Sequence, residues 1–195
     1  MLCAATCSSE NGTVLCLASQ QGRIDEVRML LRQGRLDVNQ TSTFRFTPLF
    51  AAAKRGHAAV ARMFLDEQGT DANKGRACDG ATPLYIASQN GHLEIVRMLL
   101  THSGVDAAKG RRCNGTAPVH IASKYGHAEV VRALIENGGV DANQRKTDCS
   151  GDTPLAVARQ YGQGGVISVL LHHGATSSGS SNITAQKRQV VDPHV

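Results

Sequence analysis

Residues 82–92 read Thr-Pro-Leu-Tyr-Ile-Ala-Ser-Gln-Asn-Gly-His, and this string predicts the fold because its landmarks recur along the chain at a nearly constant interval. Pro83 and its counterparts are spaced 35, 35 and 36 residues apart, and a glycine follows each proline after eight residues. A period of this length is typical of a stacked solenoid, in which one repeat buries its apolar face only against its neighbours. The prolines are Pro48, Pro83, Pro118 and Pro154, and the glycines are Gly56, Gly91, Gly126 and Gly162, with Gly22 extending the series backwards.

Each repeat predicts a pair of short helices. The hydroxyl of Thr82 can cap the start of a helix, and Pro83 suits the first helical position because its missing N–H costs nothing there. Gly91 is a typical left-handed helix stop, and His92 opens a second helix whose apolar side chains recur at helical spacing. Residues 105–115 are too polar and too rich in glycine for a helix, so we expect an extended loop with a tight turn.

The repeats predict one elongated domain at residues 11–175, between a flexible N-terminus (residues 1–10) and a disordered tail (residues 176–195). The tail is rich in serine and glycine and then mixed, without apolar periodicity. Aromatic residues are few, which suits thin two-helix layers better than one wide core. We place the five repeats at residues 11–39, 40–74, 75–109, 110–145 and 146–175.

The repeated strings resemble the ankyrin repeat, whose units carry Thr-Pro-Leu-His, Gly-His and Asp-Val-Asn. The resemblance implies an all-α ankyrin-repeat solenoid of helix-turn-helix layers with extended, β-hairpin-like finger loops. It also implies a non-catalytic interaction module, although the family binds unrelated proteins with the same scaffold. The strings that carry the resemblance are residues 47–52, 82–87, 118–122 and 153–158, with Asp-x-Asn at residues 37–39, 71–73 and 141–143.

Several positions depart from the repeat pattern. Repeat four has Ala117 in place of the capping threonine, at a cost of about 1 kcal/mol. Gly164 and Gly165 are expected inside the second helix of repeat five, at about 1 kcal/mol each relative to alanine, so this repeat should fray first. Val14 replaces the proline in repeat one, as suits a terminal repeat. The period also exceeds the family's usual value of about 33, which implies slightly longer fingers.

Charge and composition narrow the class of partner. The formal net charge is +5 and the pI is near 9.0, which favours an acidic protein surface or peptide but is modest for a protein that binds nucleic acid. No membrane-spanning or secretory segment is visible. We therefore expect a monomer that is located in the cytoplasm, and a nuclear location is also compatible with the sequence.

The sequence shows no pattern for catalysis or metal binding. A phosphate-binding loop, a nucleophile elbow and paired carboxylates are all missing, so we expect no enzyme, no cofactor and no metal. The cysteines are expected to be free thiols in a reducing compartment. Those at one position of the repeat would lie about 10 Å apart on successive layers, which is too far for a disulfide. They are Cys78, Cys113 and Cys149.

In the ankyrin family, partners usually dock on a concave face formed by the finger tips and the exposed side of each first helix. Aromatic and arginine side chains are the usual anchors of interfaces, and basic finger tips would steer an acidic peptide. Two simpler interpretations stay open: Phe44 and Phe46 can fold back onto their finger, and the basic side chains can be merely solvated. Carried over by position, the partner-binding residues are Phe44, Phe46, Lys54, Arg55, Arg76, Gln89, Asn90, Arg111, Arg112, Lys124, Tyr125, Gln160 and Tyr161.

The leading hypothesis is a protein-interaction module that binds an acidic partner on this concave, basic and aromatic face. The alternative is a regulatory inhibitor or assembly chaperone that masks a partner's functional surface. A substrate adaptor of a ubiquitin ligase ranks lower, because it would need a recruiting segment that the sequence does not show.

Histidine and asparagine side chains are expected to be structural. The resemblance implies loop hydrogen bonds for the histidines that open second helices and a buried position for His120. Asn39 resembles the asparagines that asparaginyl hydroxylases modify in ankyrin repeats, and Asn73 and Asn143 match more weakly. The primary role expected for Asn39 is to tie its loop by side-chain hydrogen bonds, and its hydroxylation is a further hypothesis.

Overall fold

The computed structural model describes residues 4–34, 36–43, 45–148 and 150–176, with side chains from residue 13 onward. These residues contain ten helices and no strand, which confirms the expected all-α solenoid. The helices are α1 (Ala4–Gln21), α2 (Ile24–Arg32), α3 (Pro48–Arg55), α4 (Ala58–Asp66), α5 (Pro83–Asn90), α6 (Leu93–Thr101), α7 (Pro118–Tyr125), α8 (Ala128–Glu136), α9 (Pro154–Gln160) and α10 (Gly164–His172).

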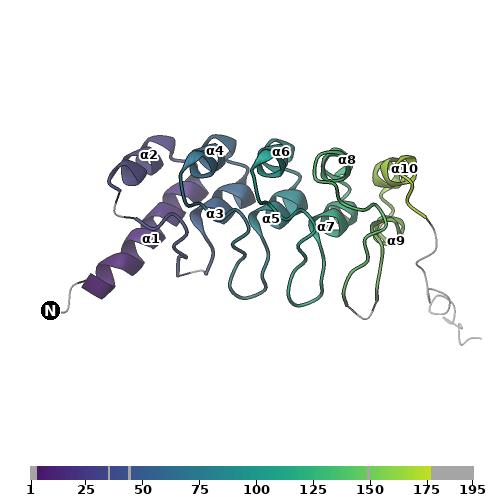
Figure 1. Cartoon of the computed structure of the whole chain (residues 1–195), viewed down its shortest axis with the longest axis horizontal. Helices are drawn as coiled ribbons and strands as arrows, with labels where there is room; N and C mark the ends of the chain where they lie inside the picture. The colour runs from purple at the N-terminus through teal and green to yellow at the C-terminus, as the bar shows by residue number, and fades with distance from the viewer. Residues whose placement is uncertain (1–3, 35, 44, 149, 177–195) are drawn as a thin grey trace, which may run out of the picture.

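The helices form two rows along one elongated stack (Figure 1). The first helices of the repeats (α1, α3, α5, α7 and α9) lie in one row and the second helices (α2, α4, α6, α8 and α10) in the other, while the long loops extend to one side. Each helix contacts its counterpart in the neighbouring repeat. No helix in the described part of the chain is both long enough and apolar enough to cross a membrane.

The predicted caps explain where the first helices begin and end. The hydroxyl of Thr82 accepts a hydrogen bond from the Tyr85 N–H at 3.1 Å, and Pro83 occupies the first turn. Gly91 ends α5 in the left-handed conformation, with a φ of 73°. At the start of α7, which lacks the threonine, the Ala117 N–H instead donates to Nδ1 of His120 at 3.3 Å.

One apolar core runs through all five repeats. The second helices bury the same position in successive layers, because the period of the sequence matches the period of the stack. At this position Phe64, Leu99, Leu134 and Leu170 are all fully buried. The small residues that line the first helices, such as Ala52, Ala87 and Ala122, let the layers approach closely.

The fingers are turns closed by backbone hydrogen bonds rather than strands. In the third repeat the Arg76 N–H donates to the Ala81 carbonyl at 2.8 Å, and the Gly80 N–H donates to the Arg76 carbonyl at 2.8 Å. Neighbouring fingers are also joined, since the Ala77 N–H donates to the Arg45 carbonyl at 2.9 Å. The β-hairpin character expected of the fingers is therefore not confirmed among the described residues.

Two element boundaries differ from the expectation. Helix α1 begins at Ala4, upstream of the boundary placed at residue 11, where a flexible segment was expected. Gly164 and Gly165 are the first two residues of α10 and not interior ones. Interior positions carry the full helix penalty of glycine, so the predicted cost in repeat five is too high. Of the expected tail, residues 177–195 lie outside the described residues.

Candidate protein-binding surface

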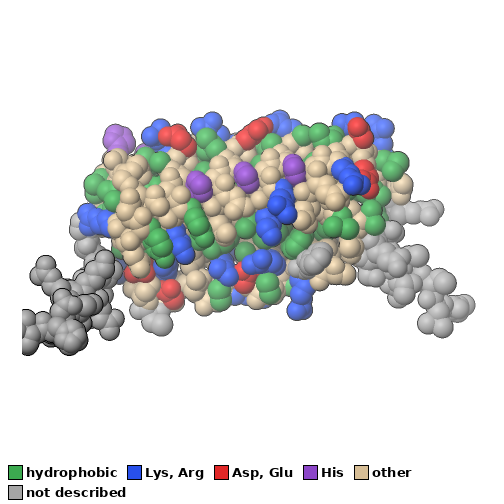
Figure 2. Space-filling model, turned by 180° about the vertical axis from the view of Figure 1, so that it is seen from behind, with side chains coloured by type: hydrophobic (Ala, Val, Ile, Leu, Met, Phe, Trp, Pro, Cys, Tyr) green, Lys and Arg blue, Asp and Glu red, His purple; other side chains and the backbone are tan. Residues whose placement is uncertain are grey.

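A row of side chains, His57, His92, His127 and Gln163, links successive repeats at the turn between the first and second helix, and we call this row the ladder. His57 and His127 each donate through Nε2, at 3.0 Å, to a backbone carbonyl near the end of the preceding repeat's first helix. Gln163 replaces histidine in repeat five and donates to the Lys124 carbonyl at 3.1 Å. Figure 2 shows histidine side chains in a row across this face. The ladder bears out the structural role that the resemblance implied for the histidines.

The ladder leaves the last turns of the first helices at the surface, and we call residues 54–55, 89–90, 124–125 and 159–161 the rim. The rim contains basic, amide and aromatic side chains and no acidic residue. Lys54, Arg55, Asn90, Tyr125 and Tyr161 are exposed. On the face in Figure 2, hydrophobic and basic side chains lie next to one another below the histidine row. The rim therefore has positive charge together with exposed aromatic surface.

A single lysine joins the aromatic side chains of repeats four and five. The Nζ atom of Lys124 lies 5.6 Å from the ring centroid of Tyr125 and 5.0 Å from that of Tyr161. Tyr125 is 49% exposed and Tyr161 is 46% exposed. Cation–π contacts of this kind hold the rings in place, so the Lys124–Tyr125–Tyr161 cluster offers two ordered aromatic surfaces beside a positive charge.

The fingers contain a second cluster, centred on Asp79. Arg76 donates through Nη2 to Asp79 Oδ2 at 2.5 Å, and Arg111 donates to the same oxygen at 2.7 Å from the next finger. The hydrogen bond from Arg76 is the main cause that holds the pKa of Asp79 well below its usual range, although burial acts in the opposite direction. The two arginines also lie over aromatic rings of the preceding repeats, at 5.7 Å from Phe50 and 5.5 Å from Tyr85 respectively.

A family model described as ankyrin repeats (3 copies) matches residues 15–110 and 103–180. The chain belongs to the ankyrin-repeat family. A search of curated proteins finds no match. Ankyrin repeats are generally modules for protein–protein interaction and are typically non-catalytic, so this ankyrin chain is assigned that general class.

The ankyrin fingers use several of the predicted binding residues internally. Arg76 and Arg111 are engaged with Asp79 and with aromatic rings, whereas Arg112 is exposed. Phe46 is half-buried and stacks on Phe50 with centroids 5.5 Å apart, which agrees with the simpler interpretation that it folds back. Phe44 lies outside the described residues.

The contact between a finger arginine and the ring of the preceding repeat is not among the features predicted from the sequence. A signal was present, because Arg76 follows Phe50 by 26 residues and Arg111 follows Tyr85 by the same interval. In the next ankyrin repeat the equivalent pair is His120 and Lys146. Because that interval recurs and links a planar ring to a cation, it could have predicted an inter-repeat contact. On the rim, Gln89 and Lys124 are half-buried and Gln160 is exposed.

Asparagine side chains tie the outer loops of adjacent ankyrin repeats. Asn39 donates through Nδ2 to the Gly69 carbonyl at 2.6 Å and accepts through Oδ1 from the Asp71 N–H at 2.8 Å. Asn73 and Asn143 make the same pair of contacts with their following repeats. The expected loop-tying role is therefore observed, and hydroxylation of Asn39 stays a prediction that intact-mass measurement can test.

The cysteines whose side chains the structure describes, Cys16, Cys78 and Cys113, are free thiols. Cys78 and Cys113 are exposed free thiols. Cys16 is buried, its thiol donates to the Phe46 carbonyl at 3.4 Å, and burial raises its pKa to about 11. Cys149 lies outside the described residues. Within the described ranges no group of three His, Cys, Asp or Glu side chains is arranged to hold a metal ion.

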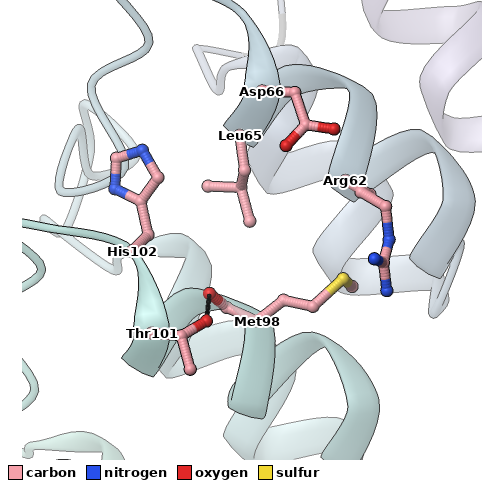
Figure 3. A pocket seen from close by; sticks show the side chains of 6 residues that line it. All are labelled: Arg62, Leu65, Asp66, Met98, Thr101 and His102. Carbon is pink, nitrogen blue, oxygen red and sulfur yellow. Dashed lines mark hydrogen bonds between the residues drawn. The ribbon is translucent and has the colours of Figure 1, made fainter.

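A shallow hollow of about 250 Å³ lies between α4 and α6 on the outer row. Figure 3 shows its lining, in which Arg62 and His102 stand on opposite sides and the Thr101 hydroxyl is hydrogen-bonded to the Met98 carbonyl at 2.9 Å. A catalytic site needs groups that converge on one reacting atom. The side chains of this hollow do not converge, so its geometry does not support a catalytic centre there.

Proposed function

We propose that this ankyrin chain binds an acidic segment of a protein partner along the rim, with the Lys124–Tyr125–Tyr161 cluster as its anchor. The observation that carries the proposal is the composition of the rim, which combines exposed aromatic rings with lysine and arginine and contains no carboxylate. Such a surface attracts negative charge over the whole length of the stack.

The cluster suits an anchor because it is ordered before a partner arrives. Lys124 is held at two points, since its Nζ lies against both rings and its carbonyl accepts from Gln163. Ordering flexible side chains during association costs free energy, so a preformed anchor binds more tightly than a mobile one. Tyrosine adds large apolar contact area and a hydroxyl that can hydrogen-bond a carboxylate.

The fingers have a supporting role in the proposal. Arg76 and Arg111 keep the fingers in register through Asp79 and are therefore not the main contacts. Arg112 and Arg45 are exposed on the fingers and extend the positive surface away from the helices. An acidic segment that crosses from the cluster to the finger tips would meet basic side chains along its path.

The test is a binding titration with a fluorescent peptide that carries alternating glutamate and leucine residues. The rim variant Lys124→Glu/Tyr125→Ala should weaken binding by at least about tenfold, because it removes an anchor ring and reverses a charge. The control variant Arg28→Glu/Met29→Ala makes the same kind of change at two exposed positions of α2 on the outer row. Equal losses in the two variants, or tight binding of a lysine-rich peptide, would contradict the proposal.

The alternative, a chaperone or inhibitor that masks a partner, would use the same contacts. The two functions differ in what happens to the partner. Once a partner is known, its activity can be measured with and without a saturating amount of this chain. If the wild-type chain lowers the partner's activity and the rim variant does not, masking is favoured over simple tethering.

A further inference from the structure

The two ends of the stack expose apolar side chains whose counterparts in other repeats are buried or partly buried. Val14 and Leu17 at the N-terminal end are each 41% exposed, and Leu171 at the C-terminal end is 49% exposed. Terminal repeats of solenoids normally carry a polar outer face that keeps the protein soluble. Contiguous apolar surface on a folded protein commonly marks an interaction site.

At the N-terminal end, Leu17 occupies a position that a preceding repeat would cover. Its counterparts in repeats three and four, Ile86 and Ile121, are only 6% and 7% exposed. Val14 aligns with the prolines of the other repeats, which are all buried. These repeats differ from repeat one in having a neighbour on that side. The exposed side chains of α1 therefore form an unoccupied half of the interface that joins repeats.

The C-terminal end carries the other half of the same interface. Leu171 aligns with Leu65, Leu100 and Ile135, which are partly buried and pack against the core. A Cβ atom added to Gly91 would meet the histidine of the next repeat at 2.6 Å, whereas the equivalent Gly162 has nothing within 4 Å. Helix α10 contains no Asp, Glu, Lys or Arg, unlike the four other second helices.

Polar groups at the two ends are complementary as well. In repeats two to five, the residue before the second helix donates from its side chain to a carbonyl of the preceding repeat. Arg23 holds this position in repeat one; it is also a donor, is exposed, and pairs with Glu26 at 3.1 Å on its own helix. The corresponding acceptor at the other end is the carbonyl of Gln160, two residues before Gly162.

We infer that a second copy of this chain stacks on the first head to tail, with the α10 end of one copy covering the α1 end of the next. The contact continues the packing between repeats, so its two halves match in shape and polarity. The contact is heterologous, since the two copies use different surfaces. In a pair of copies, each copy therefore keeps one uncovered end, to which a further copy can bind. This arrangement differs from the expected monomer, and it would extend the rim from one copy to the next.

Sedimentation velocity of the full chain in reducing buffer tests the inference, with reductant present because Cys78 and Cys113 are exposed. The weight-average mass should rise with concentration above that of the 20.7 kDa monomer. Leu17→Glu and Leu171→Glu should each weaken self-association by more than about tenfold, because each places a charge in the apolar contact. Tyr125→Glu, an equally exposed aromatic position on the rim, should not change it.

Mixing the two charged variants gives the decisive signature. The Leu171→Glu protein keeps an intact α1 end, and the Leu17→Glu protein keeps an intact α10 end. Together they should form a one-to-one dimer that grows no further. A wild-type mass that stays monomeric up to the solubility limit would overturn the inference. A dimer that only Leu171→Glu disrupts would also overturn it, because that result indicates a symmetric contact between two α10 ends.

Discussion

The guanidinium group of Arg111 lies over the ring of Tyr85 in the preceding repeat, with its Cζ atom 5.5 Å from the ring centroid. The same guanidinium donates to Asp79 Oδ2 at 2.7 Å. Arg111 thus joins its own finger to the finger and to the first helix of the repeat before it. The fingers are therefore held by side chains as well as by backbone hydrogen bonds.

Asp79→Asn is expected to lower the free energy of unfolding by about 2 kcal/mol, because it leaves two partly buried guanidinium groups without their carboxylate. Urea denaturation followed by circular dichroism measures the change. Asp25→Asn is the matched control, since Asp25 is exposed and pairs only with Arg28 at 3.2 Å. The control should cost less than about 0.5 kcal/mol, and equal losses would show that the Asp79 cluster is not structural.

Gly91→Ala and Gly162→Ala form a matched pair that measures the packing between repeats. Both glycines have a positive φ, at 73° and 68°, so each substitution costs about 1 kcal/mol from backbone strain. At Gly91 the added methyl group would also lie 2.6 Å from the His127 ring, whereas Gly162 has nothing within 4 Å. Gly91→Ala should therefore destabilise the protein by at least about 1 kcal/mol more than Gly162→Ala. Equal losses in thermal unfolding would contradict this account of the ladder.

Arg45→Gly is expected to stabilise the protein by about 0.5–1 kcal/mol. Arg45 has a φ of 62°, while the equivalent positions in the following fingers hold glycine with φ between 55° and 75°. A left-handed conformation strains any residue with a Cβ atom, and glycine relieves it. Arg112→Gly, on the finger of repeat four, should give no gain. A loss of stability in Arg45→Gly would indicate contacts of the Arg45 side chain that outweigh the strain.

His120 should make the stability depend on pH. Burial is the main cause that lowers its pKa to about 4, compared with about 6.5 in the unfolded chain. The unfolded state therefore takes up the proton first as the pH falls. The contribution of neutral His120 is complete above pH about 6.5 and is lost progressively towards pH about 4, by about 3 kcal/mol in total.

The variant His120→Phe, which reproduces the ring of Phe50 at the same position, should have a shallower decline over this range. Urea denaturation at pH 7.5 and pH 4.5 compares the two proteins. An unchanged slope in the variant would show that the loss of stability arises from other groups.

The parts of the fold that depend on local sequence could be predicted. Thr82, Pro83 and Gly91 act within a few residues of themselves, so the ends of α5 follow from the chemistry of caps. The exposed tyrosines of the rim also follow, because position in the repeat determines which side of a helix faces solvent. Both kinds of inference need only the period and the properties of single residues.

The parts that depend on contacts between distant repeats could not be predicted in the same way. The charge pattern shows Asp79 as one acid among basic finger tips, but whether Arg111 turns towards it depends on how two fingers pack. Likewise, the half-buried position of Phe46 depends on Phe50 lying 5.5 Å away. Hence the sequence could predict which side chains the repeat places on the rim and the fingers, but it did not separate the structural arginines from the exposed ones.

A ¹H–¹⁵N NMR titration of the chain with an acidic peptide containing leucine tests directly whether the rim is the binding surface. The largest shifts should occur at the rim, at residues 54–55, 89–90, 124–125 and 159–161, with the amides of α4, α6 and α8 unchanged. Shifts that gather on those outer helices while Lys124, Tyr125 and Tyr161 stay unperturbed would contradict the proposal.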